Sequence, residues 1–320
     1  MSSAPTISSA PKILVFDSGL GGLTVFVEVA KLRPHATLLY CADDAGFPYG
    51  PLSEEALVAR VMLVMESLVA AHAPDLVVIA CNTASTRVLP HLRARWPNLP
   101  FVGTVPAVKP AAERSRSRLI SVLATPGTVT RDYTRALIAS FAEGCEATLV
   151  GSSRLAPIAE DFLRGAAVSE AEIAAEIAPC FVQRPDGART DVVVLACTHY
   201  PLLLDFFRRL APWPVEWIDP APAIARQADR LLLQRFGADR IGFREPPRAI
   251  FTSGARPVPP LAAALSRLGS RGVASKRPTR LRARRAAEDA ASPPMLENRR
   301  RNAPASSRLA PWPARTRPKT

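Results

Sequence analysis

The feature that most constrains the fold of this chain is a repeated alternation of short apolar runs with longer amphipathic segments. Two of the runs, LVVIAC at 76–81 and VVVLAC at 192–197, consist almost wholly of β-branched and aliphatic residues. Runs of this kind form strands that are buried on both faces, as in parallel sheets covered by helices. The alternation therefore predicts an α/β fold with parallel-rich sheets.

The alternation occurs in two successive series. The first predicts strands at 12–19, 37–44, 76–81 and 101–105, and helices at 24–34, 53–74 and from 82 to about 95. The second predicts strands at 118–125, 147–153, 192–197 and 215–220, and helices at 131–142, 169–183, 202–211 and 223–236. Two series of similar plan predict two α/β domains. We expect 12–104 plus 217–270 to form the first domain and 105–216 the second, with a disordered N-terminus at 1–11.

The positive charge of the chain is concentrated at its C-terminal end. Residues 271–320 contain 14 lysines and arginines against 3 aspartates and glutamates, which is +11 of the total net charge of +13. This segment is rich in Arg, Pro and Ala and has little apolar periodicity, so we expect a disordered basic tail. Its charge would suit nucleic acid or another acidic surface. The alternative is a dispensable extension or a mis-framed end of the coding sequence.

The sequence also indicates a cytoplasmic protein. No uncharged apolar run reaches the roughly 18 residues that a membrane span needs, and the opening MSSAPTISSAPK does not resemble a secretory signal. The five cysteines are odd in number and scattered, which argues against a disulfide framework. No CxxC or HxxxH spacing indicates a metal site.

Cys81 and Cys197 each end a predicted strand and are followed by polar residues. These polar residues are Asn82, Thr83, Ser85, Thr198 and His199. In open α/β sheets the ligand lies beyond the carboxyl ends of the strands, where we expect both thiols. A helix that begins beside a thiol favours its thiolate form.

The chemistry of the two thiols is left open by the residues alone. One alternative is a Cys–His hydrolase in which His199 is the base. A second is a redox pair, and a third is a pair of acid/base groups that face one carbon from two sides. The fourth is a structural role as small buried residues, which we expect for Cys41, Cys145 and Cys180.

The order of five motifs carries a resemblance to a known family. The motifs are DSGLGGLTV (17–25), PYG (48–50), CNTAS (81–85), LATPGT (123–128) and CTHYPLL (197–203). Together they resemble the glutamate racemases of the aspartate/glutamate racemase superfamily, over residues 13–224. The resemblance implies a cofactor-independent, two-base interconversion of L- and D-glutamate that supplies D-glutamate for peptidoglycan. It also implies two pseudo-symmetric doubly wound α/β domains with the active site in the cleft between them.

The resemblance further implies roles for individual residues. Cys81 would act on the α-proton of D-glutamate and Cys197 on that of L-glutamate. Asp17 and His199 would assist the neighbouring thiols, and Glu160 is the candidate for the family's supporting acidic residue. The substrate would be held by Asp17, Ser18, Tyr49, Gly50, Asn82, Thr83, Thr125, Thr128, Thr198 and His199.

These residue types suit deprotonation of an amino acid. The α-proton is very weakly acidic, so donors placed at the carboxylate and a site closed to water must lower the barrier. His199 can change its protonation near neutral pH, although it could instead be structural, and Asp17 could be only a helix cap. The glycine-rich DSGLGG lacks the GxGxxG spacing of a nucleotide loop and predicts close packing of helix on strand.

The sequence differs from the family pattern at some positions, and other functions remain as alternatives. Ala196 stands where many family members have glycine. The region after FTSGA (251–255) resembles the family's last strand, and 264–269 its closing helix. Rival functions are a racemase of aspartate or another acidic amino acid, a redox sensor, and an interaction protein. Some glutamate racemases are reported to bind DNA gyrase, which the basic tail could support, and family members often form homodimers.

Overall fold

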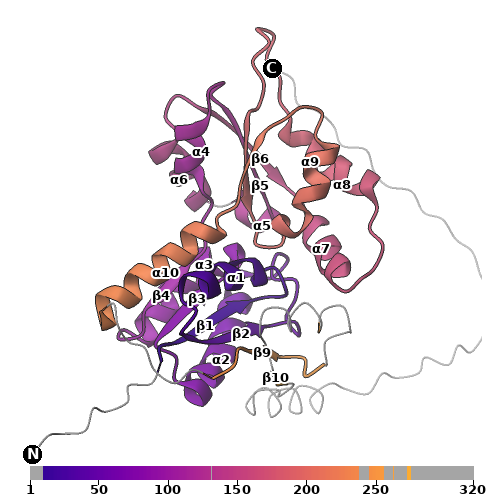
Figure 1. Cartoon of the computed structure of the whole chain (residues 1–320). Coiled ribbons are helices and arrows are strands. Elements are labelled where there is room, and N and C mark those ends of the chain that lie inside the picture. Colours follow the sequence, from indigo (N-terminus) through magenta and orange to yellow (C-terminus); the bar gives the residue numbers. More distant parts are fainter. Residues whose placement is uncertain (1–9, 131, 238–244, 256–261, 263–271, 275–320) are drawn as a thin grey trace, which may run out of the picture.

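Two parallel sheets, one above the other in Figure 1, organise the chain. This computed structural model describes residues 10–130, 132–237, 245–255, 262 and 272–274. Among these residues the first sheet has six strands in the order β10-β9-β2-β1-β3-β4, and the second has four in the order β6-β5-β7-β8. The pairings between these strands are parallel. The prediction of two α/β domains with parallel sheets is confirmed.

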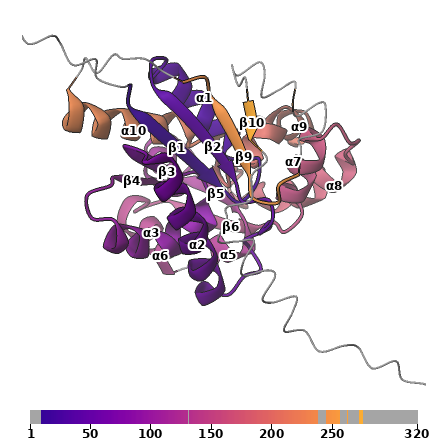
Figure 2. The same ribbon diagram turned by 90° about the horizontal axis from the view of Figure 1, so that it is seen from below.

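The first sheet is covered by helices on both faces. Its strands are β1 (Lys12–Asp17), β2 (Thr37–Ala42), β3 (Leu76–Ile79), β4 (Phe101–Gly103), β9 (Arg248–Phe251) and β10 (Gly272–Ala274). Its helices are α1 (Leu23–Leu32), α2 (Glu54–His72), α3 (Asn82–Arg95) and α10 (Ala221–Phe236). Ile13 and Val15 of β1 pack with α1 and α10, whereas Leu14 and Phe16 pack with α2 and α3. This alternation explains why the strands are apolar throughout. Figure 2 shows β1, β2 and β9 side by side.

The second sheet follows the same plan. Its strands are β5 (Leu119–Ala124), β6 (Glu146–Gly151), β7 (Val192–Ala196) and β8 (Glu216–Ile218). The apolar side chains of α4 (Val108–Arg114) and α6 (Asp132–Phe141) cover one face. Those of α7 (Leu155–Leu163), α8 (Glu170–Ile177) and α9 (Leu204–Leu210) cover the other. The shorter elements are α5 (Pro126–Val129), η1 (Ala178–Cys180) and η2 (Tyr200–Leu203).

The structure differs from the sequence prediction at several places. The helix predicted at 169–183 ends at Ile177 and tightens into η1, because Pro179 cannot continue an α-helix. Helix α7 and strand β9 (Arg248–Phe251) were not predicted, and strand β10 (Gly272–Ala274) lies in the region after 251–255. Strand β8 spans the predicted domain boundary at 216/217 and pairs with β7. The domain boundaries themselves stay predictions.

Other predictions fall on parts of the chain that the structure does not describe. Residues 1–9, the closing helix at 264–269 and the part of the tail from 275 lie outside the described residues. The disordered tail was predicted to begin at 271, and this prediction is wrong for Gly272–Ala274, which form strand β10 and pair with β9. Within the described residues, no helix combines the length and the hydropathy of a membrane span.

Candidate active site

The residues predicted for the site follow the carboxyl ends of strands in both sheets. Asp17 is the last residue of β1, and Cys81 stands two residues beyond the end of β3. Thr125 and Cys197 directly follow β5 and β7. Parallel strands end at a common edge, so each sheet collects its functional side chains along one edge.

Hydrogen bonds join these two edges. The side-chain amide of Asn82 donates through Nδ2 to the carbonyl oxygen of Ala196 at 2.7 Å. The hydroxyl oxygens of Thr83 and Thr125 lie 3.2 Å apart, and Thr24 Oγ1 donates to the carbonyl oxygen of Thr198 at 3.3 Å. Because Asn82 follows one cysteine and Ala196 precedes the other, the two thiols belong to a single site.

Cys81 is buried and occupies the N-cap position of α3 in an extended backbone conformation. Its Sγ lies 3.7 Å from Ser18 Oγ, in hydrogen-bond contact. Burial, and then the negative charge of Asp17, raise the pKa of the Cys81 thiol well above its ordinary value. Cys197 also contributes to this increase in pKa, which agrees with its position in the same site. Cys81 is therefore a protonated thiol at neutral pH.

Asp17 has one occupied oxygen and one without a partner. Its Oδ2 accepts a hydrogen bond from the amide of Gly22, the N-cap residue of α1, at 2.8 Å. Its Oδ1 is buried and has no hydrogen-bond partner in the structure. Burial is the largest cause of the raised pKa of Asp17, and it outweighs the attraction of His199. Oδ2 thus ties Asp17 to the residue that precedes α1, and Oδ1 is left as a buried acceptor without a partner.

Cys197 has an imidazole as its neighbour. Its Sγ lies 3.8 Å from Nδ1 of His199, and Nε2 of the same ring lies 2.8 Å from Glu160 Oε1. Burial opposes a charge on His199. The hydrogen bonds to Cys197 and Glu160 outweigh this effect and raise the pKa of His199 well above its ordinary value. The ring faces Cys197 through Nδ1 and Glu160 through Nε2, and the amide of Gly21 also points at Nε2, at 3.2 Å.

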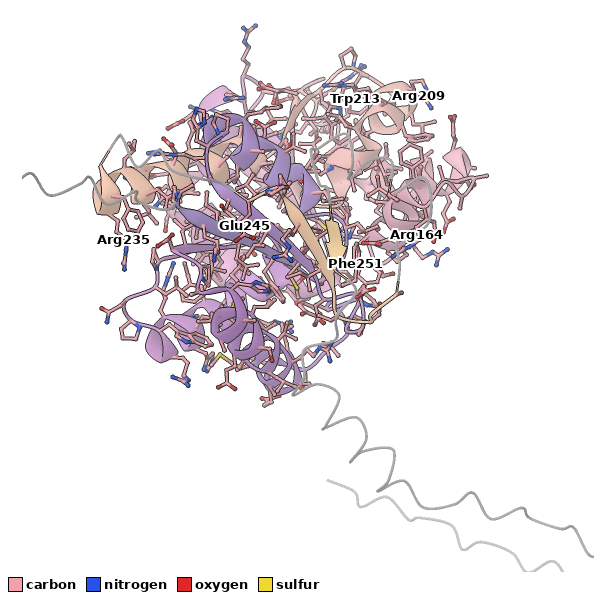
Figure 3. The ribbon with its side chains drawn as sticks, turned by 60° about the horizontal axis from the view of Figure 1, so that its bottom comes forward. Arg164, Arg209, Trp213, Arg235, Glu245 and Phe251 are labelled. Carbon is pink, nitrogen blue, oxygen red and sulfur yellow. The ribbon has the colours of Figure 1, made fainter. Side chains whose placement is uncertain are left out.

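Glu160 connects both domains with its carboxylate. Oε1 also accepts the amide hydrogen of Leu20 at 2.5 Å, and Oε2 forms an ion pair with Arg164 at 2.7 Å. Arg164 lies near the surface of the second domain (Figure 3). Burial alone would raise the pKa of Glu160, but His199, the Leu20 amide and Arg164 together lower it. Among the described residues, no group of three or more His, Cys, Asp and Glu side chains could hold a metal ion.

The glycine-rich segment after β1 allows this close approach. A Cβ at Gly19 would overlap Glu160 Oε1, and a Cβ at Gly21 would overlap the ring of His199. A Cβ at Gly22 would stand 2.7 Å from the Cβ of Asp17. The prediction of close packing is confirmed, with the addition that the contacts reach across to the second domain.

Hydroxyl and amide groups surround the thiols. Thr125 Oγ1 lies 3.1 Å from Thr128 Oγ1 and thus extends the contact with Thr83 into a chain of three hydroxyls. Asn82 Oδ1 is buried without a hydrogen-bond partner. Since buried polar atoms are rarely left unpaired, this oxygen and Asp17 Oδ1 indicate a polar ligand.

The side chain of Tyr49 is paired with another protein residue and not left free for a ligand. Its hydroxyl donates to the buried carboxylate of Asp43 at 2.5 Å, whereas a Cβ at Gly50 would meet no protein atom within 4 Å. The sequence interpretation missed Asp43, and it missed Phe47, whose ring centroid lies 5.6 Å from that of His199. The only sequence signal for Asp43 is its position near the end of a predicted strand (37–44), as Asp17 lies near the end of another (12–19).

Comparison with known proteins places this site in a family. The profile of the Asp/Glu/hydantoin racemases matches residues 24–228. A glutamate racemase of Brucella anthropi is 58% identical over 234 residues, which are 73% of this chain and 84% of the relative. The chain belongs to the glutamate racemases. It is therefore an isomerase that acts as an amino-acid racemase.

Further relatives agree with this membership of the glutamate racemases. A glutamate racemase of Sinorhizobium medicae is 58% identical over 242 residues, covering 76% of this chain and 88% of the relative. The crystal structure of Escherichia coli glutamate racemase is 36% identical and superposes with a TM-score of 0.75 over 82% of this chain and 97% of that one. That enzyme was crystallised with L-glutamate and the activator UDP-MurNAc-Ala.

Proposed function

We propose that the chain interconverts L- and D-glutamate, without a cofactor, by transferring protons between the α-carbon and the thiols of Cys81 and Cys197. One observation carries this proposal. The hydrogen bond from Asn82 to the carbonyl of Ala196 brings the ends of β3 and β7, and with them both cysteines, to one site. A single nucleophilic cysteine would not need this paired arrangement.

The two thiols would act on opposite faces of the substrate. With L-glutamate, the thiolate of Cys197 takes the α-proton, so that an S–H bond forms as the C–H bond breaks. The electron pair left on carbon delocalises into the α-carboxylate, and the thiol of Cys81 then gives its proton to the other face. This leaves D-glutamate, a thiolate at Cys81 and a thiol at Cys197. The reaction of D-glutamate is the reverse.

The electrostatics of the free protein support this division of roles. The raised pKa of Cys81 keeps that thiol protonated. Cys197 Sγ lies 3.8 Å from Nδ1 of His199, a group that can take up or return a proton. Asp17, whose charge acts on the Cys81 thiol, would assist Cys81 when D-glutamate reacts, as the family resemblance implies.

The remaining groups would bind the substrate where charge develops. The hydroxyls of Thr83, Thr125 and Thr128 are placed to donate to the α-carboxylate, whose negative charge increases in the transition state. The unpaired oxygens of Asp17 and Asn82 would accept from the ammonium group. Ser18, Tyr49, Gly50, Thr198 and His199 would complete the contacts, as the family resemblance implies.

The biological role rests on the family. We infer that the product D-glutamate enters peptidoglycan synthesis and that the enzyme works in the cytoplasm. Formation of a homodimer and a gyrase or nucleic-acid contact through the basic tail are further predictions that sedimentation and pull-down experiments can test.

Proton exchange in D₂O, followed by NMR, tests the mechanism. The parent protein should convert either enantiomer into an α-deuterated product. In Cys81→Ser, racemisation should fall by about 10²–10⁴-fold, since serine is a far weaker acid and base. This variant should still exchange the α-proton of L-glutamate without inversion and leave D-glutamate unchanged, and Cys197→Ser should show the mirror pattern.

A control variant and two contradicting results complete this test of the two-base mechanism. Cys145→Ser changes a half-buried thiol outside the site and should behave as the parent does. Equal exchange of both enantiomers by Cys81→Ser would exclude the two-base mechanism. Inversion of aspartate but not of glutamate would keep the mechanism and change the substrate.

A further inference from the structure

The loop at 43–53 joins β2 to α2 and lies against the active site. It carries Phe47, which packs on His199, and it carries Tyr49 and Gly50, two of the residues proposed to hold glutamate. The inference below deepens the proposed function and rests on it. The structure shows what fixes the position of this loop.

Asp43, at the start of the loop, has a completely buried carboxylate that accepts four hydrogen bonds. Arg60 of α2 donates to it twice, through Nε to Oδ2 at 2.8 Å and through Nη2 to Oδ1 at 2.5 Å. Tyr49 donates to Oδ2 and Thr252 to Oδ1, each at 2.5 Å. A buried carboxylate is stable only when it is paired in this way, so Arg60 and Asp43 hold each other in one geometry.

The segment after β9 is the second element that holds the loop. Thr252 follows Phe251, the last residue of β9, which Figure 3 labels. In addition to its bond to Asp43, Thr252 Oγ1 accepts the amide hydrogen of Ala45 at 3.2 Å. The next residue, Ser253, donates its amide hydrogen to Asp44 Oδ1 at 2.8 Å. Three consecutive loop residues are thus tied to the end of a neighbouring strand.

The interior of the loop is fitted to this anchor. The amide of Gly46 donates to the carbonyl oxygen of Asp43 at 2.9 Å and closes a turn. A Cβ at Gly46 would stand 2.8 Å from Asp43 Oδ2 and 3.1 Å from both Arg60 Nε and the Tyr49 ring. Burial and the charge of Asp43 raise the pKa of Tyr49, so its hydroxyl stays protonated and donates to the anchor.

We propose that Arg60 and Thr252 are positioning residues, which act through Asp43 to hold the loop at 43–53 against the active site. The Tyr49 side chain belongs to this anchor, and the loop meets the substrate through the backbone at Tyr49 and Gly50. Neither Arg60 nor Thr252 touches the reacting atoms. Their contribution is to the binding of substrate rather than to proton transfer.

Two pairs of variants separate positioning from folding. Arg60→Lys keeps the positive charge but cannot form the planar two-point contact with a carboxylate. Thr252→Val keeps the shape but loses the hydrogen bonds of the hydroxyl to Asp43, Asp44 and Ala45, and Thr252→Ser keeps the hydroxyl. Arg95→Lys is the matched control for Arg60→Lys. Arg95, the last residue of α3, forms an exposed ion pair with Glu66, which lies on α2 as Arg60 does.

We expect the loss to lie mainly in KM. A displacement of about 1 Å in a positioning group costs up to roughly 10²-fold in efficiency. Arg60→Lys and Thr252→Val should therefore raise KM for glutamate by about 10-fold to 100-fold with kcat changed less than about threefold. Thr252→Ser and Arg95→Lys should keep the parent KM. Hydrogen exchange should rise in residues 43–53 of Arg60→Lys and Thr252→Val, and remain at the parent level in the second sheet.

The outcomes distinguish this inference from the proposed function. Parent KM and parent exchange in both Arg60→Lys and Thr252→Val would overturn the inference, even if the parent racemises glutamate normally. A fall in kcat at constant KM would also overturn it. If the parent does not racemise glutamate, the proposed function fails, and hydrogen exchange in the loop still reports whether Arg60 and Thr252 hold it.

Discussion

Replacement of Glu160 by glutamine tests whether a buried charged pair links the two domains to the chemistry of Cys197. Glutamine has the shape of glutamate and can still accept the hydrogen bond from the Leu20 amide. It loses the charge that faces His199, and its NH₂ group opposes Arg164. The side chains of His199 and Glu160 are only 3% and 2% exposed, so solvent does not screen this interaction.

The expected loss of stability can be built from these contacts. The hydrogen bonds from His199 and Leu20 to the carboxylate are charge-assisted, and each weakens by about 1 kcal/mol when the acceptor becomes neutral. Arg164 is 40% exposed, so its ion pair adds little. A loss of about 2 kcal/mol corresponds to a fall of about 4–8 °C in the unfolding midpoint for a folded unit of about 150–250 residues.

The loss in stability should depend on pH. The folded pKa of His199 lies above its ordinary value of 6.5, so its stabilisation is complete below pH 6.5 and is lost as pH rises through the raised pKa. The folded pKa of Glu160 lies below its ordinary value of 4.5, so its stabilisation is complete above pH 4.5 and is lost as pH falls through the lowered pKa. The gap between parent and Glu160→Gln should be largest between pH 4.5 and 6.5.

Urea unfolding of both proteins at several pH values measures this gap, and racemisation assays measure its consequence. A His199 ring that has lost its charged partner is less well placed to exchange a proton with Cys197, so kcat/KM should fall by about 10-fold to 100-fold. The fall must be equal for both enantiomers, because their equilibrium constant is one. A gap in stability that is the same at pH 5.5 and pH 9, or that is absent, would refute the charged-pair reasoning.

Two further predictions concern the loop after β1 and the tail. Gly19→Ala should lower kcat/KM by about 10²-fold, because the new methyl group would overlap Glu160 Oε1 and stand 3.0 Å from the Phe47 ring. Full activity of this variant in a racemisation assay would mean that the loop after β1 shifts freely. A chain that ends at residue 274, and so keeps β10, should racemise glutamate at the parent rate while any binding to nucleic acid is lost. A folded but inactive truncated protein would contradict the interpretation of the tail.

Local sequence pattern predicted the fold because burial is a local property of these strands. Residues such as Ile13 and Leu14 must both be apolar when each faces a layer of helices, and this pattern is visible without knowledge of the partners. The thiols were predictable for the same reason, since each follows such a strand. Their supporting contacts were not. Glu160 reaches Leu20 across 140 positions of the chain, and it lies on α7, a helix that was not predicted.

The contacts of Tyr49 could not be predicted either, because they also join residues that are far apart in the sequence. Its motif indicated a ligand contact, yet the phenol is paired with Asp43, and that pairing depends on Arg60 and Thr252, which stand 17 and 209 positions from Asp43. No periodicity or spacing relates these residues. They are brought together only because β2, α2 and β9 are neighbours in the first sheet and its helix layer.

The two halves of the site share a plan but differ in their chemistry. Cys81 lies beside a hydroxyl and a buried carboxyl, and both its burial and the charge of Asp17 favour the thiol. Cys197 lies beside an imidazole that is paired with Glu160, a group that can take up or return a proton. A two-base reaction needs one group that gives a proton while the other takes one, and identical partners would not distinguish the two groups. The unequal partners of two similarly placed strands therefore give the proposed reaction two distinct halves.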